Sequence, residues 1–194
     1  YNGMVTSGLL NVVGEDMNGL QIAGIANITA RKLNGLQIAL CNYATKARGL
    51  QIGLVNYYRE DMKGLQLGLV NANPDTKVQM MQTTYVNIGL LSTLNRLNGV
   101  GINALGSVVH GDMNGVQITG LANLAGGTMR GVQIAGVSNI SGDNTIGLST
   151  AGLVNITGDG TKGVIIAGLT SIGGDNTSGV MMSGFMNVTG NMAS

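Results

Sequence analysis

The sequence contains one cysteine, one proline and no tryptophan among its 194 residues. A single cysteine, Cys41, can form neither a disulfide framework nor a thiolate metal cluster within the chain. No run of 18 apolar residues occurs, which argues against a transmembrane helix. Charged residues make up only 10% of the chain and the formal net charge is +1. The sequence therefore offers no basic stripe that would bind nucleic acid.

Glycine and aliphatic residues are abundant instead. The chain has 33 glycines, and 44% of its residues are hydrophobic. This composition is the reverse of that of a disordered protein. The glycines do not recur every third residue, which excludes collagen. With one phenylalanine and five tyrosines, a core has to be built from aliphatic side chains at close, repeated spacing.

A short unit recurs along the whole chain, most often every 16 residues. Residues 19–29 (GLQIAGIANIT) give its fullest form, and residues 115–123 and 131–139 repeat it closely. Residues 1–194 thus form a single repeat domain, with a longer loop at 72–83. The copies begin near residues 3, 19, 35, 49, 64, 84, 99, 115, 131, 147, 163 and 179. Such self-similarity indicates a stacked-repeat architecture.

Within each unit, counted from its leading glycine as position 1, apolar residues alternate around a polar one. Leu20 and Ile22 flank Gln21, which is typical of a strand with one buried face. Ile25 breaks the alternation, so we expect a corner at Gly24, where glycine turns the chain most easily. The leading glycine, Gly19, is expected to be a corner as well. On the rule that apolar side chains face inward, Leu20, Ile22 and Ile25 are predicted to form the core and Gln21 to lie outside.

Two polar columns follow from stacking such units about 4.8 Å apart. A side-chain amide both donates and accepts, so each amide can bond the next along a column. The asparagine column is expected to face inward; the glutamine column is expected to face outward, as a sheet-stabilising ladder or a flat docking surface for a protein or polysaccharide. The predicted ladder residues are Asn11, Asn27, Asn42, Asn56, Asn71, Asn123, Asn139, Asn155 and Asn187, with Gln21, Gln37, Gln51, Gln66, Gln117 and Gln133.

The fold predicted from this pattern is all-β: a parallel β-solenoid (β-helix) of about twelve 16-residue coils, on the order of 55–60 Å long. A 12-stranded outer-membrane β-barrel is the alternative, since units of about 10 residues could span a bilayer. The asymmetric motif recurs in every unit, which favours parallel stacking, and aromatic girdles are absent. The lack of recognisable end caps favours the barrel.

Candidate chemistry is sparse. Asp143, Asp159 and Asp175 recur at 16-residue intervals in Gly-Asp turns, and a ladder of their carboxylates could hold Ca²⁺. The same dipeptides are ordinary turn formers, and the glycine-rich calcium-binding repeat motif is absent. His110 is the only histidine. We therefore expect no catalytic residues, no cofactor and no enzymatic activity.

Three consecutive units, at residues 35–42 (GLQIALCN), 49–56 (GLQIGLVN) and 64–71 (GLQLGLVN), resemble the GLQxGLxN surface repeats of exported proteins of leptospires and Bacteroidota. The resemblance implies export and a place at the cell surface or outer membrane, and it brings no catalytic residues. Later units depart from the motif, since residues 163–169 (GVIIAGL) lack the glutamine. The start at Tyr1 rather than Met fits a processed or truncated protein.

The function expected from these observations is a non-catalytic structural or interaction scaffold of the bacterial cell envelope or surface. The alternative is an outer-membrane β-barrel that acts as a pore or as a subunit of an envelope complex. Unpaired strand edges are adhesive, so the expected partners are another protein or further copies joined through uncapped solenoid ends. A polysaccharide ligand and a membrane-proximal position are compatible with the sequence, and nucleic acid is not expected.

Overall fold

The computed structural model describes residues 1–73 and 83–190, and within them it consists of strands and turns with no helix. The strands are β1 (Asn2–Ser7), β2 (Leu10–Val13), β3 (Met17–Ala23), β4 (Ala26–Ile38), β5 (Cys41–Ile52), β6 (Val55–Ala72), β7 (Thr83–Leu94), β8 (Arg96–Val109), β9 (Met113–Thr119), β10 (Ala122–Ala125), β11 (Met129–Ala135), β12 (Ser138–Ser141), β13 (Asn144–Ala151), β14 (Val154–Thr157), β15 (Gly160–Ala167), β16 (Thr170–Gly173), β17 (Asn176–Ser183) and β18 (Met186–Thr189).

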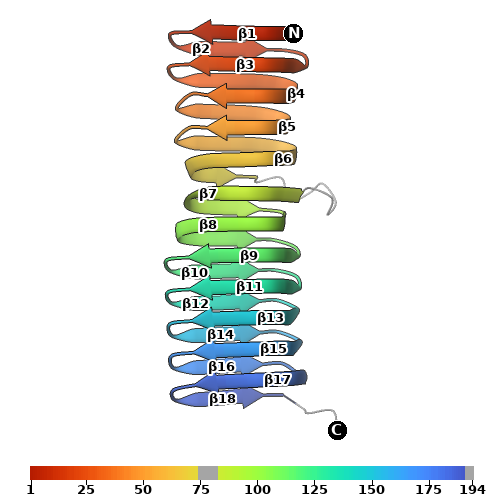
Figure 1. Ribbon diagram of the computed structural model, residues 1–194, viewed down its shortest axis with the longest axis vertical. Coiled ribbons are helices and arrows are strands. Elements are labelled where there is room, and N and C mark those ends of the chain that lie inside the picture. The colour runs from red at the N-terminus through yellow and green to blue at the C-terminus, as the bar shows by residue number, and fades with distance from the viewer. Residues whose placement is uncertain (74–82, 191–194) are drawn as a thin grey trace.

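These strands stack in parallel as a straight β-solenoid (Figure 1). Residues one repeat apart are paired, as in Gly3 with Gly19 and Gly131 with Gly147. The solenoid makes about 11 turns. The twelve predicted repeat starts are separated by eleven intervals, so the two numbers agree. The predicted parallel solenoid is confirmed. The antiparallel barrel is wrong as a fold, because a motif repeated by translation pairs each unit with the next in the same direction.

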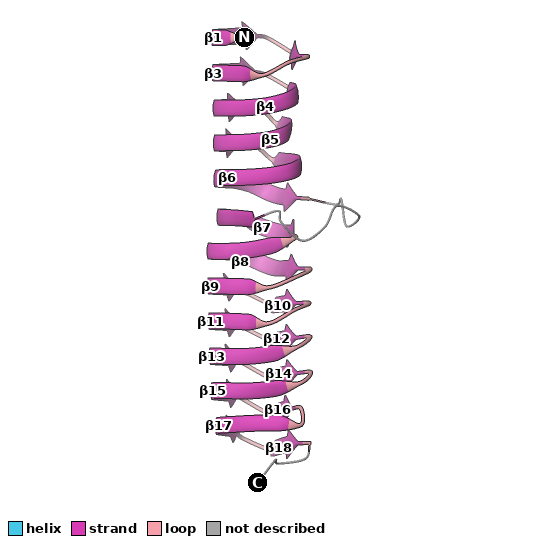
Figure 2. Cartoon of the chain, turned by 90° about the vertical axis from the view of Figure 1, so that its right-hand side faces the viewer, coloured by secondary structure: helices cyan, strands magenta, loops and turns pink. Residues whose placement is uncertain are grey.

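Each turn presents two flat sides (Figure 2). In the turn that contains β9 and β10, the longer strand ends at Thr119 and the shorter one begins at Ala122. The predicted corner at the inner glycine is confirmed, since β3 ends at Ala23 and β4 begins at Ala26. The copies that begin at residues 35, 49 and 64 have one residue fewer at this corner. Beyond the corner, neighbouring coils are again in register, with Asn42 opposite Asn56.

We name the surfaces by repeat position. Face A carries the outward side chains of positions 2 and 4: Met4, Thr6, Leu20, Ile22, Leu36, Ile38, Leu50, Ile52, Leu65, Leu67, Val86, Ile88, Val100, Ile102, Val116, Ile118, Val132, Ile134, Leu148, Thr150, Val164, Ile166, Val180 and Met182. Face B carries those of positions 8 and 10: Leu10, Val12, Ala26, Ile28, Cys41, Tyr43, Val55, Tyr57, Val70, Ala72, Leu91, Thr93, Gly106, Val108, Ala122, Leu124, Ser138, Ile140, Val154, Ile156, Thr170, Ile172, Met186 and Val188. The loop edge is the set of turns that connects one coil to the next.

The direction of the side chains differs from the prediction. Gln21 is fully buried, whereas Ile22 and Ile25 are 36% and 51% exposed and Leu20 is half-buried. Alternation correctly placed Leu20 and Ile22 on one side and Gln21 on the other. The assumption that the apolar side faces inward was wrong, because a buried amide is tolerated once it is hydrogen-bonded, and here the next coil supplies the bonds.

The degenerate copy begins at Tyr85, one residue later than the predicted Thr84. Val86 pairs with Leu65 and Asn87 pairs with Gln66, so this copy also lacks one corner residue, as the three copies before it do. The longer loop precedes this copy. Its residues 74–82, which include Asp75 and Lys77, lie outside the described part of the chain.

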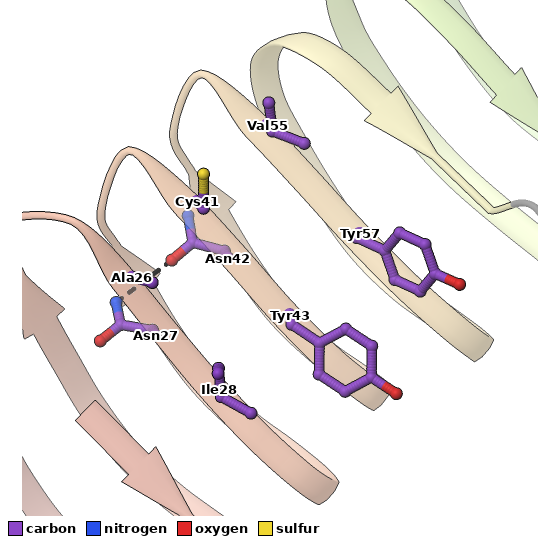
Figure 3. Close-up of a pocket in the computed structure, with 8 residues that line it drawn as sticks. All are labelled: Ala26, Asn27, Ile28, Cys41, Asn42, Tyr43, Val55 and Tyr57. Atoms are coloured by element: carbon purple, nitrogen blue, oxygen red, sulfur yellow. Dashed lines mark hydrogen bonds between the residues drawn. The ribbon is translucent and has the colours of Figure 1, made fainter. Parts of the chain in front are cut away.

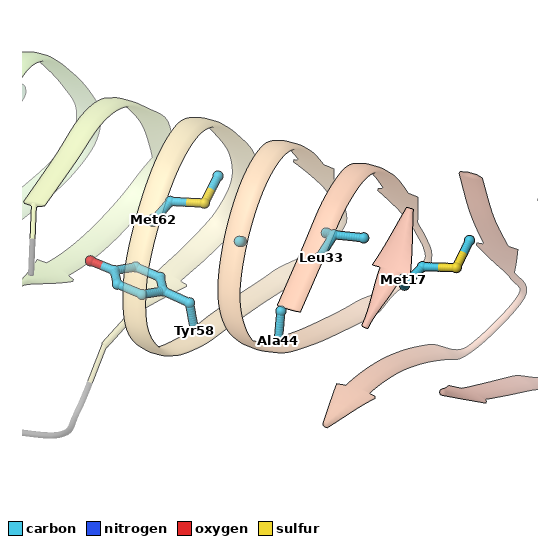
Figure 4. Close-up of a cluster of buried hydrophobic side chains, with 6 residues drawn as sticks. Met17, Leu33, Ala44, Tyr58 and Met62 are labelled. Carbon is cyan, nitrogen blue, oxygen red and sulfur yellow. The ribbon is translucent and has the colours of Figure 1, made fainter. Parts of the chain in front are cut away.

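Two apolar clusters occupy the interior toward the loop edge, and Figure 4 shows the one that contains Met17 and Tyr58. Their large members, such as Met17, Tyr58 and Met113, are fully buried. The Tyr58 hydroxyl lies 2.7 Å from Thr84 Oγ1, so its polar end is also satisfied. The clusters consist of Met17, Leu33, Ala44, Ala47, Tyr58 and Met62, and of Leu94, Leu97, Val109, Met113, Ala125 and Met129.

Every unit except the one at Tyr85 has a leading glycine, which lies inside a long strand and has a positive φ. The corner expected at Gly19 is therefore wrong, because β3 continues through this residue. Gly131 has φ of 124°, and a Cβ added there would lie 2.1 Å from the carbonyl oxygen of Gly115 in the preceding coil. A side chain at this position would both strain the backbone and push two coils apart. The glycine column therefore permits the close stacking of the coils.

The prediction that follows compares two glycines. Gly131→Ala should lower the free energy of unfolding by about 3 kcal/mol or more, through backbone strain and overpacking. Gly106→Ala is the control, because its added Cβ would meet no atom closer than 3.5 Å and should change stability by less than about 1 kcal/mol. Urea unfolding followed by circular dichroism measures both. Equal midpoints for the two variants would contradict the role given to the glycine column.

Candidate functional site

The most regular polar constellation is a column of asparagine amides inside the rod. Asn27 Nδ2 donates to Asn42 Oδ1 at 3.1 Å and to the carbonyl oxygen of Ile38 at 2.9 Å (Figure 3). Each amide thus bonds the next coil twice, once to an amide and once to the end of a long strand. The column continues without a break through Asn11, Asn27, Asn42, Asn56, Asn71, Asn87 and Asn103.

The column changes its path where serine replaces asparagine. Ser92 and Ser107 occupy the predicted positions, and their hydroxyls lie 2.7 Å apart. Asn87 and Asn103, which precede the corner in the same strands β7 and β8, carry the amide column past them. Farther along, Asn123 donates to Asn139 at 2.9 Å, and Asn155 bonds the Ile166 carbonyl oxygen. The asparagines of the predicted column are buried, except that Asn187, in the last coil, is exposed. Amide-to-amide bonds within that column join Asn11 through Asn71 and Asn123 to Asn139.

The glutamines form a second inner column, in which the amides point the opposite way. Gln37 Nε2 donates back to Gln21 Oε1 at 2.7 Å, Gln51 to Gln37 at 2.8 Å, and Gln66 to Gln51 at 3.0 Å. A separate pair joins Gln133 to Gln117 at 2.9 Å. The predicted glutamine ladder therefore exists, but it is buried and cannot be an outer docking surface.

Each glutamine column leaves one donor and one acceptor without a partner at its ends. These atoms are Gln21 Nε2 and Gln66 Oε1 in the long column and Gln117 Nε2 and Gln133 Oε1 in the pair. The neighbouring coils place Val5, Asn87, Gly101 and Ser149 at the equivalent position. None of these side chains extends the column, because each is apolar, absent or too short. The columns are structural and carry no titratable group.

Much of the charge of the described residues lies at the loop edge, whereas Arg48, Lys63, Arg130 and Lys162 lie in the long strands, exposed just before the leading glycine. Arg31 pairs with Glu15, Lys46 with Glu60 at 3.1 Å, and Arg96 with Asp112 at 3.4 Å. The pKa of Arg31 is raised, chiefly by its hydrogen bond to Glu15 and then by the negative charges nearby. His110 Nδ1 lies 3.1 Å from the carbonyl oxygen of Leu94. Exposed pairs of this kind add little to stability.

The three candidate calcium ligands lie on this edge and are exposed. Asp143 and Asp159 are stacked, since the Asp159 amide donates to the Asp143 carbonyl oxygen at 2.9 Å. Asp175 follows in the next coil, with Gly160 opposite Asn176. Within residues 1–73 and 83–190, no group of three or more His, Cys, Asp or Glu side chains could hold a metal ion. The calcium site thus stays a prediction and gains no cluster to support it.

The outer surface of the coils is apolar. Every aliphatic side chain of face A is exposed or half-buried, and only Thr6 and Thr150 interrupt its two columns. Face B is more varied, with Cys41, Gly106 and Ser138 among its members. A shallow depression of about 240 Å³ on face B lies beside the stacked rings of Tyr43 and Tyr57, whose centroids are 5.2 Å apart (Figure 3).

The depression and face A are the surfaces that the sequence reasoning missed. The depression is lined by Ala26, Asn27, Ile28, Cys41, Asn42, Tyr43, Val55 and Tyr57. Because the aliphatic residues were assigned to the core, no apolar outer surface was expected. The only hint in the sequence was the repeat of the amides themselves, since glutamines one repeat apart can satisfy each other inside a narrow coil, as asparagines can.

Comparison with known proteins places no constraint on this site. No protein-family model, curated protein or solved structure matches the chain. In the part of the chain that the structure describes, no helix is long and apolar enough to cross a membrane. The surface itself is therefore the basis for assigning a function.

The inner asparagine column yields a test. Asn42→Ala should lower the free energy of unfolding by about 3 kcal/mol, because it leaves the Ile52 carbonyl oxygen and the amides of Asn27 and Asn56 without their partner. Asn34→Ala removes an equivalent bond, to Asn18, from an outer column and should cost less than about 1 kcal/mol. Urea unfolding of both variants gives the comparison, and similar losses would show that the inner column has no special weight.

Proposed function

We propose that this protein is a non-catalytic structural or interaction scaffold of the bacterial cell envelope or surface. The observation that carries the proposal is the separation of its residues: amides and two apolar clusters fill the interior, aliphatic side chains dominate faces A and B, and charges lie on or beside the loop edge. An exposed apolar area of this extent is typical of a surface that binds another macromolecule.

The loop edge supports the non-catalytic part. A catalytic site needs a nucleophile, an acid or a base held within hydrogen-bond reach of one another. His110 bonds a backbone oxygen, and Asp112 accepts from Arg96 and from the Thr128 amide. These groups are engaged with the fold, and Asp143, Asp159 and Asp175 repeat from coil to coil as turn residues do.

The envelope location is supported by the resemblance of the units at 35–42, 49–56 and 64–71 to bacterial surface repeats. Faces A and B offer few hydrogen-bonding groups for a glycan, since their polar side chains are scattered hydroxyls and the depression beside Tyr43 is lined almost entirely by apolar atoms. A protein partner therefore fits these faces better than a polysaccharide.

Location can be tested by thiol labelling, because Cys41 is the only cysteine. In a Cys41→Ser background, Asp159→Cys places a thiol on the exposed loop edge. In the source bacterium, a membrane-impermeant maleimide should label this thiol in intact cells or after the outer membrane is made permeable. The Cys41→Ser chain without the new thiol is the matched control. Labelling that requires rupture of the inner membrane would contradict an envelope location.

A further inference from the structure

We propose that face A is an interface on which a second copy of this chain packs, sheet against sheet. The proposal rests on the exposed residues of the face and stands independently of where the protein is located in the cell. Its three supports are the composition of the face, its flatness and period, and its area.

The first support is the composition of face A. Ile118 and Ile134 are 36% and 38% exposed, while Gln117 and Gln133 between the outer columns are fully buried. Hydrophobic side chains therefore stand in two outward rows with no charged residue between them. The exposed position just before the leading glycine borders these rows and is charged in four of the repeats, at Arg48, Lys63, Arg130 and Lys162. Burial of such side chains against a partner removes apolar area from water, which favours association.

The second support is geometric. Ordinary sheets twist by about 20–25° from strand to strand, and flat sheets of many strands are typically stabilised by stacking. The long strands from β1 to β17 keep nearly one direction along the rod (Figure 1). A twisted sheet could match this surface over only a few strands. A second copy has the same flatness and the same coil spacing, so its side chains can interdigitate along the whole length.

The third support is area. A face about 13 Å wide, from four residues at about 3.3 Å, and about 55 Å long has roughly 700 Å². A standard stable interface buries about 800 Å² per partner. One face is therefore large enough for a dimer. Face B is less suited, because small and polar residues such as Gly106 and Ser138 interrupt it.

A lipid surface fits face A less well. Segments that lie in a membrane interface combine apolar residues with an excess of Lys or Arg and with Trp or Phe. Here the chain carries ten basic and nine acidic residues, no Trp and one Phe. Basic residues border face A in only four of the twelve repeats, at Arg48, Lys63, Arg130 and Lys162. The loop edge pairs some of its charges, as in Arg31 with Glu15 and Arg96 with Asp112.

The test is the mass of the chain in detergent-free buffer, measured by light scattering and sedimentation over a concentration series. The expected species is a dimer without higher oligomers. A face-to-face pair is closed, whereas end-to-end contact would add copies without limit. The double variant Ile118→Lys/Ile134→Lys should weaken the dimer by roughly 100-fold, since each lysine would be buried without a counter-charge.

The matched control is Leu124→Lys, which lies on face B in the same coil as Ile118 and is 37% exposed. This variant should leave the dimer unchanged. Circular dichroism and urea midpoints establish that each variant is folded. If the double variant does not fold, Ile118→Ala/Ile134→Ala replaces it, with an expected weakening of roughly tenfold.

Three results would overturn the proposal. One is a folded wild-type chain that stays monomeric, and another is a dimer that Leu124→Lys disrupts while the face A variants do not. The third is flotation of a monomeric chain with vesicles of phosphatidylethanolamine and phosphatidylglycerol, abolished by the face A variants, which would make lipid the occupant. A dimer that only the face A variants weaken supports it.

Discussion

A buried side-chain amide needs both a donor and an acceptor, and in this rod it finds them in the coils above and below. Asn42 accepts from Asn27 and donates to Asn56, while Gln37 donates to Gln21 and accepts from Gln51. The pairing fixes the spacing and the register of the coils together. The asparagine amides donate to the following coil and the glutamine amides donate to the preceding one. Each coil in this region therefore both donates to and accepts from each of its two neighbours.

This requirement also determines the outer surface. An interior filled by amides, small residues and two apolar clusters leaves no room for two further rows of aliphatic side chains, so Ile22 and its equivalents point outward. The glycine column, through residues such as Gly131, lets the coils approach closely enough for the amides to meet. The result is a rod held together by polar groups inside, with apolar surfaces left for partners.

Much of the fold could be predicted from the sequence, because translation of an asymmetric motif already implies parallel stacking. The corner at Gly24 and the inner position of Asn27 followed from the break in alternation and from the chemistry of the amide. The orientation of Gln21 could not be obtained in this way. Alternation assigns Leu20 and Ile22 to one side of a strand, but it does not state which side is inside.

The start of the degenerate copy was predicted at Thr84 instead of Tyr85. That prediction counted back from residues beyond the corner. Because this corner lacks one residue, every position before it was shifted by one. The candidate site was hardly predictable at all. Face A consists of residues that any general rule assigns to a core, and only the pairing of Gln37 with Gln21 reveals that the core is elsewhere.

The central claim is that glutamine and asparagine amides, rather than aliphatic side chains, line the interior. Hydrogen exchange of side-chain amide protons, followed by NMR, tests it most directly. The amides of Asn27, Asn42, Gln37 and Gln51 should exchange at least about 100-fold more slowly than the amide of Asn34 in the outer column. Exchange of the glutamine amides as fast as that of Asn34 would place them outside and contradict the account.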